Sequence, residues 1–93
     1  MQVQVHASHP EIVKRLKRAA GHLERVVHMI EEKKTCLEIA QQLQAVVNAL
    51  QNAKSELVQD HIENCLTEAL EKSTSKEKRL ASIKEFKEIT KYL

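Results

Sequence analysis

The sequence has one glycine, one proline, one tyrosine, one phenylalanine and no tryptophan. Tight hairpin turns depend on glycine and proline, and strands favour aromatic residues, so these shortages argue against sheets, sandwiches and barrels. There is no long uninterrupted apolar run, which argues against a membrane span, and the first residues lack the basic-then-apolar pattern of a secretory signal. We therefore expect a cytoplasmic protein with no membrane partner.

The chain has 93 residues, enough for one small domain and too few for a multidomain enzyme. Helix-forming residues dominate its composition, so the predicted fold class is all-α. A lone chain of this size buries only about 60 to 65% of the surface that its unfolded form exposes, and self-association is therefore expected.

Periodicity and capping patterns predict three helices in a single domain over 1–93. After a flexible arm over 1–8, apolar residues three and four apart predict helices over about 9–33, 36–72 and 75–92. Each helix follows a capping box, in which a Ser or Thr precedes a Glu by three residues: Ser8 and Glu11, Thr35 and Glu38, and Thr74 and Glu77.

The charges are unevenly distributed along the chain. Residues 9–34 carry seven basic and four acidic side chains, 35–71 carry one and six, and 72–93 carry seven and three. The densest basic cluster lies on the first helix and consists of Lys14, Arg15, Lys17 and Arg18. Such a cluster suits contacts to phosphates, and the alternative is a solvated face that balances the acidic middle helix.

Two cysteines and a histidine have the spacing of a metal site. His61 and Cys65 are four residues apart and share one face of the second helix. Cys36 lies 25 residues before His61, a rise of roughly 37 Å along a helix, so one continuous helix cannot bring all three together. Antiparallel pairing of two copies of this helix would place Cys36 of one chain beside His61 and Cys65 of the other, giving two identical sites. The pairing face would hold Leu43, Val47, Leu50 and Val58.

The donor types indicate which metals fit. Cys36 would be the first helical residue after Thr35, where free N–H groups and the positive helix end favour a thiolate. Two thiolates and an imidazole suit trigonal Cu(I) or, with a fourth ligand, Zn(II), Co(II) or Ni(II). His6 or His9 could supply that ligand, whereas structural or solvent roles are expected for His22 and His28. The alternative is that Cys65 is simply a buried thiol, His61 a surface histidine and Cys36 a small residue near a cap.

Several stretches together carry a family resemblance: RLKR at 15–18, GH at 21–22, TCLEIAQQL at 35–43, NAL at 48–50 and DHIENC at 60–65. In these stretches the chain resembles the CsoR/RcnR family of metal-responsive transcriptional repressors, most strongly from about residue 9 to 70. The resemblance implies an all-helical protomer, an antiparallel helical-bundle dimer and a tetramer built as a dimer of dimers. It also implies binding to double-stranded operator DNA in the metal-free state and release when metal binds between protomers at Cys36, His61 and Cys65.

The chain departs from its relatives at positions that bear on the inducer. Copper-sensing members usually have a Tyr before the first Cys and an acid early in the third helix, whereas this chain has Thr35 and, around Ala81, only Glu77 and Glu85. Nickel and cobalt sensors recruit a histidine from the N-terminal arm, where this chain has His6 and His9. Formaldehyde sensors use an N-terminal Pro, and persulfide sensors have a second Cys where this chain has His61.

These observations predict a metal-sensing repressor that responds to Cu(I) or to Ni(II)/Co(II). With no helix-turn-helix visible, we expect DNA phosphates and groove shape to be read by the basic cluster and by Lys54. The alternative within the fold is a thiol-based sensor of persulfide, oxidant or aldehyde that uses Cys36. No enzymatic activity and no small organic substrate are expected, because no oxyanion hole or third orienting group is apparent near Cys36 and His61. The remaining alternative is a purely structural or partner-binding helical bundle in which the cysteines have no sensing role.

Overall fold

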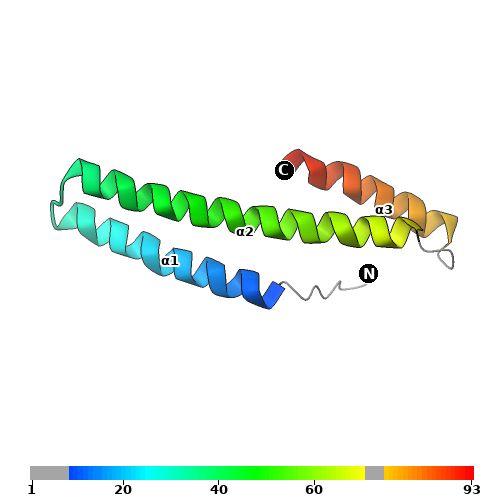
Figure 1. The fold of residues 1–93 in the computed structure, drawn as a ribbon, viewed down its shortest axis with the longest axis horizontal. Coiled ribbons are helices and arrows are strands. Elements are labelled where there is room, and N and C mark those ends of the chain that lie inside the picture. Colours follow the sequence, from blue (N-terminus) through cyan, green and yellow to red (C-terminus); the bar gives the residue numbers. More distant parts are fainter. Residues whose placement is uncertain (1–8, 71–74) are drawn as a thin grey trace. The chain divides into compact units, whose positions relative to one another are not determined.

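The computed structural model describes residues 9–70 and 75–93, which form helices and no strand. Helix α1 spans His9–Glu31, α2 spans Cys36–Leu70 and α3 spans Lys76–Ile89, followed by a 3-10 turn, η1, over Thr90–Tyr92 (Figure 1). The predicted all-α fold with three helices is confirmed. The expected arm over 1–8 and the expected end of the second helix at 71–72 lie outside the described residues. Two compact units are present, Met1–Lys54 and Ser55–Leu93, and α2 continues through both.

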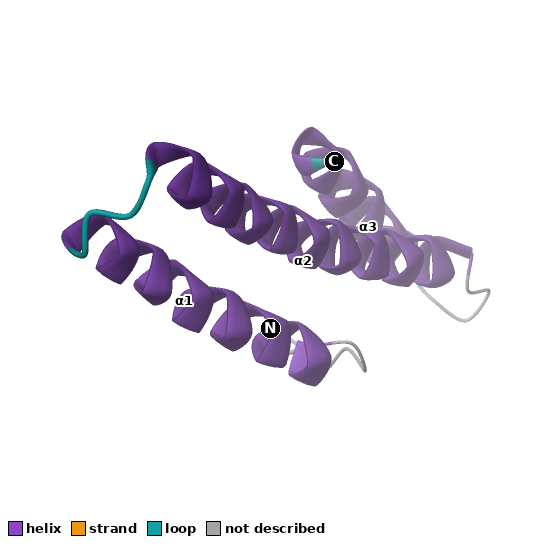
Figure 2. Ribbon diagram, turned by 60° about the vertical axis from the view of Figure 1, so that its left-hand side comes forward, coloured by secondary structure: helices purple, strands orange, loops and turns teal. Residues whose placement is uncertain are grey.

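In the first unit, α1 lies antiparallel to the first part of α2, and the loop over residues 32–35 joins them (Figure 2). The contact uses one narrow stripe of each helix. From α1 the buried side chains are Ile12, Ala19 and Val26, spaced by seven residues, and from α2 they are Val46 and Ala53, also seven apart. This seven-residue spacing is typical of two long helices packed along a single seam.

Helix α1 ends two residues earlier than the sequence predicts. Lys33 has a φ of 60°, the left-handed conformation, and the backbone N–H groups of Lys33 and Lys34 donate to the carbonyls of Ile30 and Met29 at 3.1 and 3.0 Å. This is the Schellman arrangement, in which glycine is the usual left-handed residue. No glycine marks this position, so the end of α1 could not be predicted from the sequence. A residue with a side chain in the left-handed conformation costs roughly 1 to 2 kcal/mol.

A second apolar stripe in the first unit stays exposed. Leu16, Leu23 and Ile30 of α1 and Leu43 and Leu50 of α2 are each more than 40% exposed. Exposed apolar residues that recur along a helix in this way are typical of an interaction face.

One residue of the predicted pairing face is not available on the surface. Leu43, Val47 and Leu50 are exposed as expected, but Val58 is 2% exposed and belongs to the core of the second unit. Leu57, which is 40% exposed, continues the seven-residue spacing of Leu43 and Leu50. Val58 therefore cannot belong to the pairing face that the sequence predicts, and Leu57 is the exposed residue beside it.

In the second unit, α3 packs against the last part of α2 (Figure 1). Ser75 is the N-cap of α3, since its hydroxyl accepts a hydrogen bond from the Lys78 N–H at 3.3 Å. The predicted cap, Thr74, lies outside the described residues. Across the helices, the buried Ser82 hydroxyl donates to a Glu68 carboxylate oxygen at 2.8 Å. This pair fixes the register of α3 on α2.

No helix within the described ranges combines the length and the apolar character that a bilayer span requires.

Candidate metal centre and basic groove

Helix α2 places His61 and Cys65 one turn apart on one face, as the spacing predicts. Cys65 is buried, with 1% of its surface exposed, whereas the His61 side chain is 25% exposed. The thiol is therefore the more buried of the two donors, and the imidazole is the one that solvent reaches.

A third donor reaches this site from α3. Glu85 Oε2 lies 3.7 Å from His61 Nε2, and the Cys65 thiol points at the same oxygen from 4.0 Å. The three donor atoms all lie within 4.8 Å of one another. From the sequence, Glu85 is only one of two acids around Ala81, because the register of α3 against α2 is not visible there.

The surroundings of Cys65 disfavour its thiolate while no cation is bound. Burial raises the pKa of the Cys65 thiol, and the negative charges of Glu85 and then Glu68 raise it further. A bound cation would offset all of these effects, because it neutralises a thiolate and a nearby carboxylate together. Sulfur, imidazole nitrogen and carboxylate oxygen are also the donor types that transition-metal ions take in proteins, so the donor set fits a metal ion.

Cys36 is the first residue of α2 and is exposed. Thr35 caps this helix end as predicted, since its Oγ1 accepts a hydrogen bond from the Glu38 N–H at 3.1 Å. Cys36 is not part of the donor group formed by His61, Cys65 and Glu85. The continuity of α2, on which the argument for a site shared between two chains depends, is observed from Cys36 to Leu70.

Of the two histidines expected as a fourth ligand, the structure describes only His9. His9 is the first residue of α1 and belongs to the first unit, and the described donor group does not include it. His6 lies outside the described residues.

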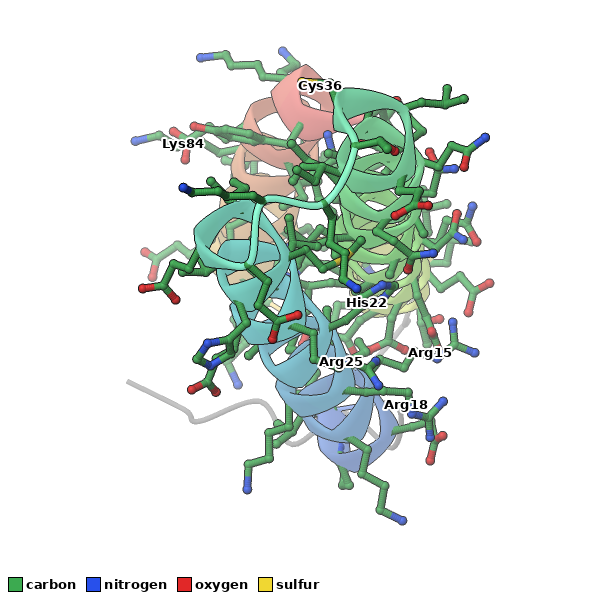
Figure 3. All side chains as sticks on the ribbon, turned by 90° about the vertical axis from the view of Figure 1, so that its left-hand side faces the viewer. Arg15, Arg18, His22, Arg25, Cys36 and Lys84 are labelled. Carbon is green, nitrogen blue, oxygen red and sulfur yellow. The ribbon has the colours of Figure 1, made fainter. Side chains whose placement is uncertain are left out.

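A basic groove of about 300 Å³ lies between α1 and α2 in the first unit. Arg15, Arg18 and His22 line it from α1 together with one acidic residue, Glu11, and Asn52 lines it from α2. Figure 3 shows the labelled Arg15, Arg18 and His22 side chains on the side of α1 that faces α2. His22 Nε2 lies 2.8 Å from Gln42 Oε1 and so bridges the two helices, which agrees with the structural role expected for it.

The groove divides the predicted basic cluster into two pairs. Arg15 and Arg18 line it, but Lys14 and Lys17 do not, although all four side chains are exposed. Arg25 continues the same face of α1 and lines a neighbouring groove with His22 and Gln42 (Figure 3). Spacings of three, four and three residues separate Arg15, Arg18, His22 and Arg25. This spacing alone predicts that the four residues share one face of a helix.

Comparison with known proteins identifies the family. Residues 8–92 match the sequence profile of the family described as a metal-sensitive transcriptional repressor. The copper-sensing transcriptional repressor RicR of Mycobacterium tuberculosis is 37% identical over 57 residues, covering 61% of this chain and 59% of RicR. The copper-sensing transcriptional repressor CsoR of Bacillus subtilis is 30% identical over 81 residues, covering 87% of this chain and 80% of CsoR.

A solved structure gives a match over nearly the full length. The nickel-responsive transcriptional regulator InrS superposes with a TM-score of 0.74 at 32% identity, covering 99% of this chain and 100% of the InrS chain. Within RicR, by contrast, the matched region is less than two thirds of the relative's length. The chain belongs to the metal-sensitive transcriptional repressors of the CsoR/RcnR family.

Proposed function

We propose that this protein is a repressor that binds operator DNA when metal-free and leaves it when Cu(I), or Ni(II) or Co(II), binds a site shared between protomers. His61 and Cys65 of one protomer and Cys36 of another would hold the ion. The observation that best supports the proposal is that the donor atoms of His61 and Cys65 lie within 4.8 Å of each other on one face of α2. The printed functions of the relatives, copper sensing and nickel response, support a transition-metal inducer.

Symmetry and the exposed apolar stripe support a site that two chains share. Leu43, Leu50 and Leu57 are exposed at seven-residue spacing along α2, and Leu50 lies close to the midpoint between Cys36 and Cys65. Two copies of α2 that pair antiparallel about that midpoint would cover the stripe and bring each Cys36 to the opposite chain's His61 and Cys65. The expected dimer of dimers remains part of this proposal, and Leu16 and Leu23 of α1 offer further apolar surface for it.

The basic groove supports DNA binding through phosphates. Arginine guanidinium groups match phosphate oxygens with two parallel N–H donors, and Arg15 and Arg18 present two such groups over one cavity. We place the localised phosphate contacts there, and we assign Lys14 and Lys17 to the longer-range attraction of the duplex. Lys54 is exposed but lies in register with Leu50 and Leu57, so we expect it to contribute less.

Metal and DNA would act on each other through the shared interface. If metal favours a dimer geometry in which the grooves no longer match the spacing of the phosphates, each ligand weakens the other by the same factor. Coupling free energies of this kind are typically about 1 to 3 kcal/mol, which is 5- to 150-fold in affinity.

The direct test is an anaerobic titration of the reduced protein with Cu(I), Ni(II) and Co(II). Thiolate-to-metal absorption and release of a labelled promoter fragment are followed in the same samples. We expect one ion per protomer with loss of DNA binding, and both responses should disappear in Cys36→Ala and His61→Ala. His28→Ala is the matched control, because His28 is an exposed α1 histidine whose partners are Glu24 and Glu31. Tight metal binding without any effect on DNA would refute the proposed regulation.

The exposure of Cys36 favours one alternative, a thiol-based sensor of persulfide, oxidant or aldehyde. Cys36 is open to reagents, whereas Cys65 is buried beneath two carboxylates. In that case, oxidants or persulfides would release DNA from the wild-type protein and not from Cys36→Ala, and none of the three metals would bind.

A further inference from the structure

We propose that Glu85 of α3 is itself a metal ligand, the fourth donor beside His61, Cys65 and Cys36 of the partner subunit, and that it selects a divalent ion over Cu(I). This inference rests on the proposed function, because it names the class of inducer for the same site. It replaces the arm histidines, His6 and His9, as the source of the fourth ligand.

The geometry around one carboxylate oxygen carries the argument. In a tetrahedral site with metal–ligand distances of about 2.0 to 2.3 Å, neighbouring donor atoms lie roughly 3.3 to 3.6 Å apart. Glu85 Oε2 lies 3.7 Å from His61 Nε2 and 4.0 Å from Cys65 Sγ. Glu85 Oε2 would therefore need to approach each donor by only a few tenths of an ångström, whereas the His61 and Cys65 donor atoms, which lie within 4.8 Å of each other, would have to close further to complete three corners of a tetrahedron. A hydrogen bond from the imidazole to this oxygen would instead need about 2.7 to 3.2 Å.

Two carboxylates lie near Cys65, and their contacts distinguish them. Glu68 accepts a hydrogen bond from the buried hydroxyl of Ser82 at 2.8 Å, so its carboxylate is held in the contact between α2 and α3. The Glu85 side chain is 53% exposed and directs one oxygen at both metal donors. Glu85 is thus the carboxylate that can move onto an ion without breaking a buried contact.

The charge count favours a divalent ion. Two thiolates and one carboxylate bring three negative charges to the site, and the imidazole ligand brings none. A monovalent ion would leave two of these charges uncompensated, and a divalent ion would leave one. Excess charge is costly beside a buried group such as Cys65. Cu(I) is also satisfied by soft sulfur and nitrogen donors, whereas a carboxylate oxygen suits harder, divalent ions.

The site therefore differs from a three-donor Cu(I) site in both coordination number and ligand hardness. On this basis the chain takes a borderline divalent ion, with Zn(II), Co(II) and Ni(II) as the class. Glu85 also ties α3 to the metal, because it is the α3 residue of the donor group.

The test is Co(II) and Cu(I) titration of reduced full-length protein, comparing the wild type with Glu85→Gln. Co(II) reports coordination directly, since four-coordinate Co(II) has intense d–d absorption that weakens when water or a further ligand expands the site. We expect Glu85→Gln to lower Co(II) affinity by roughly ten- to a hundredfold or more and to change the d–d spectrum, with Cu(I) affinity little changed. Glu85→His, which returns a donor at this position, should restore four-coordinate absorption at a shifted wavelength.

Glu88→Gln is the matched control, because it removes the same charge from an exposed residue of the same helix. It should leave both titrations unchanged, and far-ultraviolet circular dichroism checks that each variant keeps its helices. If Glu85→Gln weakens Co(II) and Cu(I) equally and leaves the d–d spectrum intact, Glu85 only positions His61 and the inference is wrong. An unchanged Co(II) titration would also overturn it, while leaving a Cys36-dependent metal site in place. Failure of the wild-type protein to bind any of these metals would overturn the proposed function as well.

Discussion

In the basic cluster, Arg15 and Arg18 line the groove, whereas Lys14 and Lys17 lie outside it. This difference leads to a quantitative prediction for DNA binding. Each phosphate contact releases about 0.9 counterion, so at 0.15 M salt one contact is worth roughly a factor of five in affinity. Arg15→Gln with Arg18→Gln removes both arginines of the groove. For every protomer that contacts the duplex, we therefore expect the DNA affinity to fall about 30-fold. The slope of log K against log salt should fall in magnitude by about two for each such protomer.

The assay is fluorescence anisotropy with a labelled promoter fragment at several salt concentrations, using metal-free protein. Lys14→Gln with Lys17→Gln is the matched control, since it removes the same charge from exposed positions of the same helix outside the groove. The loss of DNA affinity in this control should be severalfold smaller, and the slope of log K against log salt should change little. Equal losses for the two pairs would refute the assignment of phosphate contacts to the groove, because charge alone would then explain the binding.

Two further predictions concern the metal-free fold. Lys33→Gly should raise the free energy of unfolding by about 0.5 to 1 kcal/mol, because glycine adopts the φ of 60° found at Lys33 without strain. Thermal melts of the variant and the wild type measure this change. A lower melting temperature for the variant would contradict the assigned end of α1. The second concerns Cys65, whose pKa in the folded chain is raised above the ordinary 9.0, so the folded state holds this proton more tightly than the unfolded state. Its contribution to stability is then full below about pH 9 and is lost as pH rises through the folded pKa. Urea unfolding from pH 7 to 11 should show this loss in the wild type and not in Cys65→Ala.

Helix positions were predictable wherever the local signal was strong. Thr35 caps α2 through the Glu38 N–H as the capping box predicts, and the spacing of apolar residues identified the helix that follows. The end of α1 was missed by two residues because the left-handed position is held by Lys33 and carries no glycine signal. A helix end can thus be predicted from the sequence when a side chain makes the capping hydrogen bond, as at Thr35. It cannot be predicted when backbone geometry alone ends the helix.

The division between core and interface was only partly predictable. Periodicity marks the apolar side of α2, but it does not say which apolar residues pack inside one chain and which remain for a partner. Val58 was assigned to the pairing face and is buried, whereas its neighbour Leu57 is exposed. The two are one residue apart, about 100° around the helix, and only the packed structure decides which of them is buried.

The candidate site shows the same limit. His61 and Cys65 were identified because both lie on one helix at a spacing whose geometry is fixed. Glu85 was not chosen over Glu77, because its approach depends on how α3 docks on α2, which the Ser82–Glu68 contact sets. Contacts within a helix follow from the sequence, and contacts between helices need the packed structure.

If two protomers share each metal site, mixing two inactive variants should restore metal binding. Cys36→Ala and Cys65→Ala each lack one ligand in every site, so neither protein alone should show the metal titration of the wild type. When they are unfolded and refolded together in equal amounts, random pairing makes half of the dimers mixed, and each mixed dimer has one intact site of two. We therefore expect the mixture to recover about one quarter of the wild-type metal stoichiometry. No recovery in the mixture, with both variants folded and dimeric, would contradict the shared site.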